Sequence, residues 1–281
     1  MNGAEVAAAA QLACLLEVSA PKPGNVSPGR DFHDTRYEDF LASAVAIGPA
    51  LAASGERPLG VTIRAAVEET GRWARSNTNL GMVLLLAPLA RAARLGDGGL
   101  RERVTRVLAD TSVADAEEAY AAIRRARPGG LGRSVAEDVA TAPTVTLREA
   151  MGLAAGRDTI AREYVTDFAV TFELGAPSVR AARVSGLSWA DATVEGYLAI
   201  LTGVPDTHIA RKLGSEEAAR IAGRAARVSA AGGVRTGEGR AALAALDAEL
   251  RDARNSRNPG ATADLTCAAL FVVILEDGWN S

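Results

Sequence analysis

The sequence predicts an all-α fold, a single compact multi-helix domain that covers residues 1–281. Apolar residues make up 48% of the chain but aromatic residues only 4%. Alanine, leucine and valine must therefore fill the interior, and alanine is the best helix former. A β-sandwich or barrel would need more β-branched and aromatic residues. Alternating patterns of strand length are nearly absent, and no internal repeat or clear linker divides the chain.

Apolar residues three and four positions apart predict the helices in order. The first covers 4–19 and ends at a proline-rich loop, and the second covers 37–54 and is closed by Gly55 and Pro58. Residues 127–133 are predicted to be a loop, and 134–145 is ambiguous, with a flexible lid as one interpretation. The other helices are expected at 60–75, 80–95, 99–109, 114–126, 146–153, 156–174, 177–184, 189–202, 207–213, 216–230 and 238–254, and from Pro259 through Ile274.

Charge and composition exclude several classes of function. The formal net charge is -3, and no long basic run or aromatic-interleaved basic stripe occurs, so nucleic acid is not expected as a partner. The most apolar stretches are far shorter than the roughly 20 residues of a membrane span. The first residues lack a basic region and carry Glu5, so we expect no signal peptide. Cys14 and Cys267 lie in apolar helical patterns and are interpreted as reduced core residues of a cytoplasmic protein.

The loop "PKPGNVS" holds Lys22, one of two lysines in a chain that otherwise uses arginine. Prolines on both sides stiffen its backbone, and Gly24 permits a close backbone approach. Together with the amides of Gly24 and Asn25, the Lys22 ammonium would suit an anion such as phosphate. The alternative is a helix-breaking loop with a solvated lysine.

The stretch "GRDFHD" places Asp31, His33 and Asp34 close together. Acids at this spacing can bind Mg²⁺ through oxygen, although Asp31 or Asp34 could instead start the next helix. His33 and His208 are the only histidines, and neither has a paired ligand four residues on. A zinc site is therefore not expected.

The stretch "SNTNLG" precedes an apolar helix and supplies Asn77, Thr78, Asn79 and Gly81. Small polar residues at a helix start can bind an anion, and they can equally cap the helix. Since capping needs only one such residue, the cluster favours a functional interpretation.

The stretch "VPDTHIARKLG" places Arg211 and Lys212 about one turn after Asp206. Asp206 occupies a helix N-cap position, which is the structural alternative to a functional role.

The stretch "NPGATADLT" begins the last helix. Asn258 suits the cap, Pro259 the first helical position, and Gly260 leaves room near the helix start. Asp264 then lies in an almost wholly apolar run. Burying a lone carboxylate is unfavourable unless it is paired or bound to a metal, so Asp264 is either a site residue or half of a salt bridge.

Taken together and in order, these segments resemble the triphosphoribosyl-dephospho-coenzyme A synthase family over residues 5–275. Where that family has a "PKPGLVD"-type loop, this chain has "PKPGNVS", and "FHDT" stands for an "HKDM"-type stretch. The later counterparts are "NTNLG" for "NTHKG", "DTH" for "DTN", and "NPGATADLT" for "SPGGSADLL". The loss of "HK" from the "NTHKG" turn indicates a divergent branch of the family.

The resemblance implies an all-helical, Mg²⁺-using transferase. It would move the 5-triphosphoribosyl group of ATP, with release of adenine, to the 2′-hydroxyl of 3′-dephospho-CoA, in the biosynthesis of a prosthetic group for acyl-carrier proteins. A divergent branch leaves other acceptors open, such as a small hydroxyl or aromatic compound of a cofactor pathway, for example a pterin-type cofactor.

Under this hypothesis Asp34, Asp206 and Asp264 share the roles of Mg²⁺ ligand and general base. The residues expected to bind substrate are Lys22, Gly24, Asn25, Asn77, Thr78, Asn79, Gly81, Arg211, Lys212, Asn258 and Gly260. Two other functions stay open: a Mg²⁺-dependent nucleotide hydrolase or phosphotransferase, and a non-catalytic helical nucleotide-binding protein. Assembly as a homodimer also stays open.

Overall fold

The computed structural model describes residues 1–74, 76–128 and 137–279. Every regular element among these residues is a helix, and the only strand-like pairing in the same ranges is one isolated bridge between Ser27 and Arg30. The prediction of an all-α fold is therefore confirmed.

The helices agree closely with the sequence pattern. In chain order they are α1 (Gly3–Ser19), α2 (Tyr37–Ala46), α3 (Gly48–Ala52), α4 (Leu59–Trp73), α5 (Leu80–Ala93), α6 (Leu100–Ala109), α7 (Val113–Ala126), α8 (Leu147–Ala154), α9 (Thr159–Val165), the π-helix η1 (Val170–Gly175), α10 (Ala176–Val184), α11 (Trp189–Gly203), α12 (Thr207–Leu213), α13 (Ser215–Ala230), the 3₁₀-helix η2 (Gly233–Arg235), α14 (Gly237–Leu250) and α15 (Gly260–Asp277).

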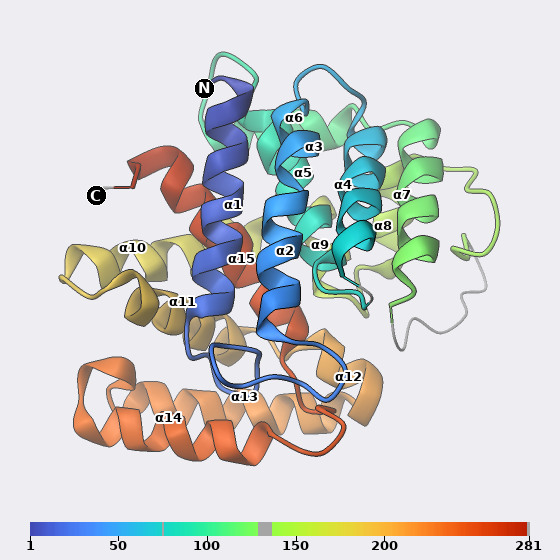
Figure 1. Ribbon diagram of the computed structural model, residues 1–281. Helices are drawn as coiled ribbons and strands as arrows, with labels where there is room; N and C mark the ends of the chain where they lie inside the picture. The colour runs from blue at the N-terminus through green and yellow to red at the C-terminus, as the bar shows by residue number, and fades with distance from the viewer. Residues whose placement is uncertain (75, 129–136, 280–281) are drawn as a thin grey trace.

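Helix α15 is the centre of the fold. Its side chains from 261 to 274 are buried except that of Asp264, which is partly exposed. A helix that is apolar on all sides needs neighbours on all sides. It contacts α1, α5, η1, α10 and α11, and Figure 1 shows it running behind α1 through the middle of the molecule.

Helix α1 packs directly on α15. The Sγ atoms of Cys14 and Cys267 lie 3.5 Å apart between the two helices, and both thiols are free and buried. The expectation that both are reduced core residues is confirmed. The start of α1 is fixed by a capping box in which Asn2 and Glu5 bond to each other's backbone.

Helices α13 and α14 form a layer beneath the rest, across the lower end of α1 and α11 in Figure 1. A second apolar cluster joins this layer to α11, through residues such as Tyr197, Leu201, Ile221 and Leu246. The Tyr197 hydroxyl of α11 also donates to the carbonyl of Pro23 at 2.9 Å, which fastens the proline-rich loop to α11.

Two predicted helices are interrupted in the structure. The helix expected over 37–54 divides into α2 and α3 at Ile47, and Pro49 takes an early position in α3 where a missing N–H does no harm. The helix expected over 156–174 breaks after Val165, where Asp167 and Phe168 both have positive φ.

The carboxylate of Glu163 explains how the chain resumes after this break. It is buried and accepts hydrogen bonds from the amides of Val170 (2.9 Å) and Thr171 (2.9 Å) and from the Thr171 hydroxyl (2.6 Å). It therefore satisfies the free amides at the start of η1, a role that helical periodicity does not reveal.

Residues 129–136 lie outside the described part of the chain, and with them most of the loop over 127–133 and the start of the segment interpreted as a lid. The described remainder, 137–145, contains no helix. Its turn is held by Glu137, which accepts from the amide (3.0 Å) and hydroxyl (2.6 Å) of Thr144.

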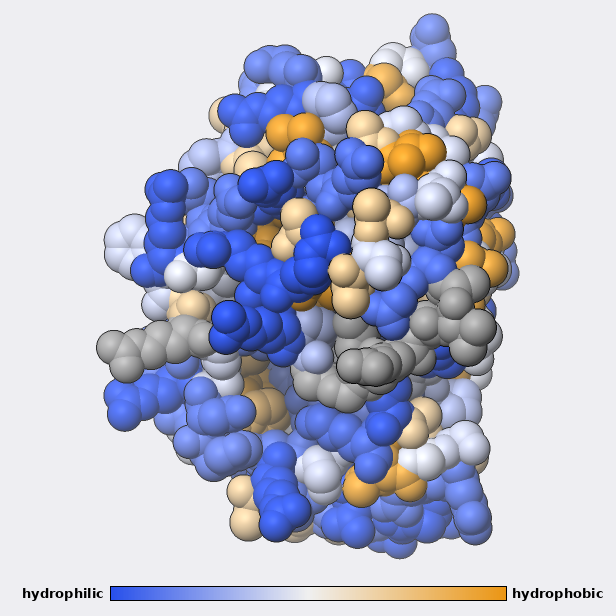
Figure 2. Space-filling view, turned by 90° about the vertical axis from the view of Figure 1, so that its right-hand side faces the viewer, coloured by the Kyte–Doolittle hydropathy of each residue, from blue (hydrophilic) through white to orange (hydrophobic). Residues whose placement is uncertain are grey.

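The face shown in Figure 2 is covered mostly by hydrophilic side chains, with apolar residues singly or in small groups. No helix in the described ranges is both long enough and apolar enough to cross a membrane.

The packing of α4 on α7 gives a prediction about stability. A Cβ at Gly60 would lie 2.5 Å from the carbonyl oxygen of Asp115 and 2.6 Å from its Cα, so Gly60→Ala must push two backbones apart. We expect a loss of about 1–3 kcal/mol in the free energy of unfolding, measured by urea denaturation.

Gly223→Ala is the matched control. Gly223 is exposed within α13 and has no neighbour within 4 Å of a Cβ, so alanine should stabilise by about 0.5–1 kcal/mol through helix propensity. Equal effects of the two substitutions would contradict the close approach of α4 and α7.

Candidate active site

A cavity of about 1100 Å³, called here the central cavity, opens between the ends of several helices. Its walls come from the turn before α5, the C-terminal end of α7, the start of α9, helix α12 and the first turns of α15. Typical small-molecule sites have volumes of about 300–1,000 Å³, so the central cavity lies just above that range.

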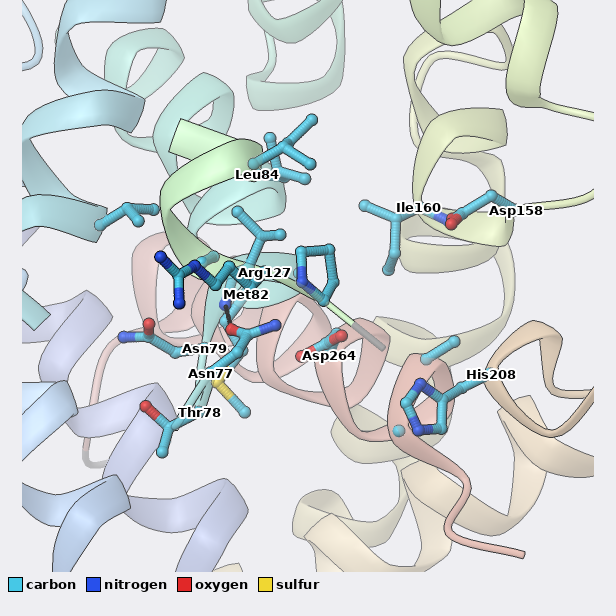
Figure 3. Close-up of a pocket in the computed structure, with 18 of the residues that line it drawn as sticks. Asn77, Thr78, Asn79, Met82, Leu84, Arg127, Asp158, Ile160, His208 and Asp264 are labelled. Atoms are coloured by element: carbon cyan, nitrogen blue, oxygen red, sulfur yellow. Dashed lines mark hydrogen bonds between the residues drawn. The ribbon is translucent and has the colours of Figure 1, made fainter. Parts of the chain in front are cut away.

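Asp264 lies in the middle of the central cavity, on α15 (Figure 3). A Cβ at Gly81 would lie 2.0 Å from Oδ2 of Asp264, so only a glycine lets the start of α5 approach this carboxylate. The turn "NTNLG" and the helix start "NPGATADLT", about 180 residues apart in the chain, therefore meet here.

The Asp264 carboxylate has no hydrogen-bond or ion-pair partner among the residues that the structure describes. Burial raises its pKa well above 3.8, and the nearby charges of Glu17, Asp206 and Asp158 raise it further, while Arg211 opposes them. The salt bridge that the sequence left open is thus not formed with any described arginine. An unpaired carboxylate with a raised pKa, facing a cavity, is typical of a functional group.

Helix α12 supplies the wall beside Asp264. His208 lies in its first turn, and Arg211 lies one turn later. Arg211 forms an ion pair with Asp158 (2.5 Å), which also caps α9 by accepting from the amide of Ile160 at 2.8 Å. Burial and the cations Lys212 and Arg211 lower the pKa of His208 to about 3, so its imidazole is neutral.

Cationic side chains are numerous around the central cavity. The cavity-lining cations without an ion-pair partner in the described ranges are Arg124, Arg125, Arg127, Arg157, Lys212 and Arg254. Figure 3 shows Arg127 on one side of Asp264 and His208 on the other. Such a ring of guanidinium and ammonium groups suits a polyanion such as a phosphate chain.

The turn before α5 lines the cavity through Asn77, Thr78 and Asn79. Asn77 Oδ1 accepts from the Leu80 amide at 3.1 Å and so caps α5. The Thr78 hydroxyl bonds to that of Ser43 (2.6 Å), and the Asn79 amide donates to the Thr70 hydroxyl (3.1 Å). These bonds tie the turn to α2 and α4 and hold its polar groups at the cavity wall.

Lys22 does not line the central cavity, which corrects the expectation of an anion-facing ammonium. Its side chain is fully buried, with Nζ 3.1 Å from Oε1 of Glu17. Nζ also donates to the carbonyls of Glu17 and of Ala20 (3.3 Å). The alternative of a solvated lysine does not hold either.

The position of Lys22 explains why lysine stands there. The carbonyls of Glu17 and Ala20 belong to the last turn and cap of α1, where a cation satisfies free acceptors. One ammonium offers three donors in different directions and here meets three acceptors. Burial disfavours charge on both partners, so it lowers the pKa of Lys22 and raises that of Glu17, against their mutual attraction.

The rest of the "PKPGNVS" loop is held by α14. The Gly24 amide donates to Asp247 at 2.8 Å, and Arg251 donates to the Asn25 carbonyl at 2.7 Å. Gly24 is therefore not at the cavity, and its amide is occupied. Asn25 does line the cavity, where its amide donates to Oδ1 of Asn258 at 2.8 Å.

Asp206 also lies outside the cavity lining, which corrects its expected role as metal ligand or base. It is buried and caps α12 through the amide of Ile209 at 3.0 Å. Its other oxygen accepts from the amide (2.7 Å) and hydroxyl (2.8 Å) of Thr262. Both oxygens are thus used to tie α12 to α15, the structural alternative that the sequence offered.

Asp34 lines the cavity from an exposed loop, with His33 Nε2 at 3.8 Å from Oδ2. Burial lowers the pKa of Lys212, and the negative charge of Asp34 opposes this shift. Within the described ranges, no group of three or more His, Cys, Asp or Glu side chains could hold a metal ion. The predicted three-aspartate set is therefore not assembled.

The cavity nevertheless fits a magnesium ion that arrives with a nucleotide. Mg²⁺ is usually held by one or two carboxylates together with substrate phosphates and waters. Asp264 offers one unpaired carboxylate at the cavity, and Asp34 a second on its wall.

The structure therefore brings Asp34, Asn25, Asn77, Thr78, Asn79, Gly81, Arg211, Lys212, Asn258, Gly260 and Asp264 to one cavity, and leaves out Lys22, Gly24 and Asp206. Sequence reasoning missed Asp158, His208 and the arginines at the ends of α7 and α8. The capping pattern "RDTI" could have located Asp158, but no local signal gives its partner Arg211.

Comparison with known proteins identifies the family. Residues 3–281 match the family described as CitG, ATP:dephospho-CoA triphosphoribosyl transferase. The 2-(5''-triphosphoribosyl)-3'-dephosphocoenzyme-A synthase of Klebsiella pneumoniae is 29% identical over 278 residues, which cover 92% of this chain and 91% of that protein. A protein of Stutzerimonas stutzeri (strain A1501), described as a probable synthase of the same kind, is 35% identical over 105 residues, 37% of this chain and 36% of that protein.

A solved structure shares the fold. The crystal structure of a protein from Archaeoglobus fulgidus, provisionally described as a triphosphoribosyl-dephospho-coA synthase, superposes with a TM-score of 0.67 and 30% identity. The superposition covers 85% of this chain and the whole of the Archaeoglobus fulgidus chain. The fold and site define a helical transferase. The chain belongs to the ATP:dephospho-CoA triphosphoribosyl transferase family.

The buried ion pair between Lys22 and Glu17 gives a prediction about stability. Lys22→Met leaves Glu17 buried without its cation and the end of α1 without its cap. We expect a loss of about 3–5 kcal/mol in the free energy of unfolding by urea titration. The double variant Lys22→Met/Glu17→Leu should recover much of this loss, and a single variant as stable as the wild type would contradict the pair.

Asp264 gives a prediction about pH. Since its pKa is raised in the folded protein, its favourable contribution is present below about pH 4 and is lost as pH rises. The stability of Asp264→Asn relative to the wild type should therefore increase from pH 4 to pH 8 in urea titrations.

The exposed Glu149 is the control of opposite sign. Hydrogen bonds from Thr146 lower its pKa, so the relative stability of Glu149→Gln should fall over the same pH range. A flat profile for Asp264→Asn would show that its carboxylate is not desolvated.

Proposed function

We propose that this protein transfers the 5-triphosphoribosyl group of ATP to the 2′-hydroxyl of 3′-dephospho-CoA and releases adenine. The observation that carries this proposal is the unpaired Asp264 carboxylate in a cavity ringed by unpaired cations. Both substrates are polyphosphates, so two anionic chains must be held around one reacting carbon. The central cavity, at about 1100 Å³, is larger than most sites for one small molecule.

The chemistry assigns a role to the Asp264 carboxylate. The C1′–N9 bond of ATP breaks, and its electron pair leaves with adenine. The acceptor oxygen forms a new bond to C1′ and gives up its proton, which Asp264 is placed to take as general base. A carboxylate with a raised pKa is better matched to removing a hydroxyl proton than an ordinary carboxylate.

The cationic rim would hold the phosphates. Arg125 and Arg127 border the cavity at the end of α7, whereas Lys212 and Arg254 border it near α12 and α15. Arg211 is held by Asp158 and contributes a fixed guanidinium between them. Mg²⁺, when bound with ATP, would neutralise phosphate charge, and Asp34 on the cavity wall is the carboxylate that would hold it. A cytoplasmic location and a homodimer stay predictions from the sequence.

The activity can be tested by incubating the protein with ATP, Mg²⁺ and 3′-dephospho-CoA and measuring adenine by chromatography. Adenine release that depends on the acceptor is expected, and Asp264→Asn should lower the rate by about 10²–10⁴-fold with unchanged folding. The exposed Glu149→Gln is the control and should keep the wild-type rate.

Other products in this assay would indicate other functions. Release of ADP or phosphate without adenine would indicate a hydrolase or phosphotransferase. Binding of ATP by calorimetry with no turnover of any acceptor would indicate a non-catalytic nucleotide-binding protein.

A further inference from the structure

The ring of His208 lies beside Gly260, one helical turn before Asp264 on α15. The atoms of its ring lie 3.3–3.5 Å from the position that a Cβ at Gly260 would take. Gly260 and Asp264 are four residues apart on α15 and so share one face of that helix. Figure 3 shows the imidazole and the carboxylate on the same wall of the cavity. Gly260 thus leaves the imidazole room beside the first turn of α15.

The contact with Arg211 determines which ring nitrogen of His208 carries the hydrogen. Nη2 of Arg211 lies 3.3 Å from Nδ1 of His208. A guanidinium can only donate, so Nδ1 must accept, and in a neutral imidazole the hydrogen then resides on Nε2. The guanidinium is itself held in place by Asp158 at 2.5 Å. The chain Asp158, Arg211, His208 therefore presents Nε2–H as a hydrogen-bond donor.

The charge state of His208 is set by its surroundings. Burial and the two cations that follow on α12 disfavour imidazolium and lower the pKa to about 3. His208 is therefore not a phosphate-binding cation. It is also a poor general base, because its free lone pair is engaged by Arg211, and this leaves Asp264 to take the acceptor's proton.

We propose that the Nε2–H of His208 is a catalytic hydrogen-bond donor to a ring nitrogen of the adenine that leaves. The inference rests on the proposed function. When the C1′–N9 bond breaks, its electron pair flows into the purine, and N3 and N7 become stronger acceptors. A donor aimed at one of them stabilises the transition state more than bound ATP. His208 keeps its proton, while the released adenine takes one from solvent.

An uncharged donor suits this partner better than it suits a phosphate. Arg211 and Lys212, on the same helix, offer charge-assisted hydrogen bonds to any phosphate within reach, and such bonds are the stronger ones. A purine nitrogen carries no full charge, and a neutral, oriented N–H can recognise it without attracting the triphosphate. His208 would thus help to place the base, and the cations the phosphates.

The test compares ATP with 3-deaza-ATP and 7-deaza-ATP, in which one ring nitrogen is replaced by carbon. In the full-length protein with Mg²⁺ and 3′-dephospho-CoA, His208→Phe should lower the kcat of base release from ATP by about 10²-fold. The wild type should lose a similar factor on one of the two analogues. On that analogue His208→Phe should lose nothing further, because the contact is already absent.

The control is His208→Gln, whose amide retains a donor and which should stay within about tenfold of the wild type on ATP. Circular dichroism and thermal unfolding establish that each variant is folded. A wild-type rate for His208→Phe, or losses that multiply on both analogues, would overturn the assignment of His208 alone. Absence of adenine release by the wild type would overturn the proposed function and this inference together.

Discussion

The site depends on the contact between the start of α5, at Gly81, and the second turn of α15, at Asp264. There Gly81 comes so close to Asp264 that any side chain would displace the carboxylate. The N-terminal end of a helix is the one that favours negative charge, so α5 partly offsets the desolvation of Asp264. The remaining desolvation stays as a raised pKa. The fold thus tolerates a desolvated carboxylate, which costs stability, at the position where the proposed chemistry needs a base.

Three other buried acids have partners within the described residues, and the comparison clarifies what Asp264 does. Asp206 and Glu163 each accept three hydrogen bonds from neighbouring amides and hydroxyls. Glu17 is paired with Lys22. These groups hold helix ends together. Burial alone therefore does not identify a functional acid here; a carboxylate at the cavity with no partner among the described residues does.

The charges of the cavity are arranged around that carboxylate. Guanidinium and ammonium groups stand at the ends of α7, α8 and α12, while the wall beside Asp264 is formed by a neutral imidazole and a glycine. Cations on the rim can hold anionic chains without neutralising the central base. The pair between Arg211 and Asp158 keeps one of these cations fixed and at the same time orients His208.

The sequence alone determined the all-α fold, most helix positions and the identity of the segments at the site, because helical periodicity, caps and proline or glycine breaks are local signals. It also singled out Asp264 as a carboxylate in an apolar run. Only the tertiary structure decided between the two interpretations of each candidate. Lys22 and Asp206 proved to be caps, whereas Asp264 has no partner in the part of the chain that the structure describes, and His208 acquires its role through Arg211. Such outcomes depend on which distant atoms complete a hydrogen-bond shell, and no local pattern contains that information.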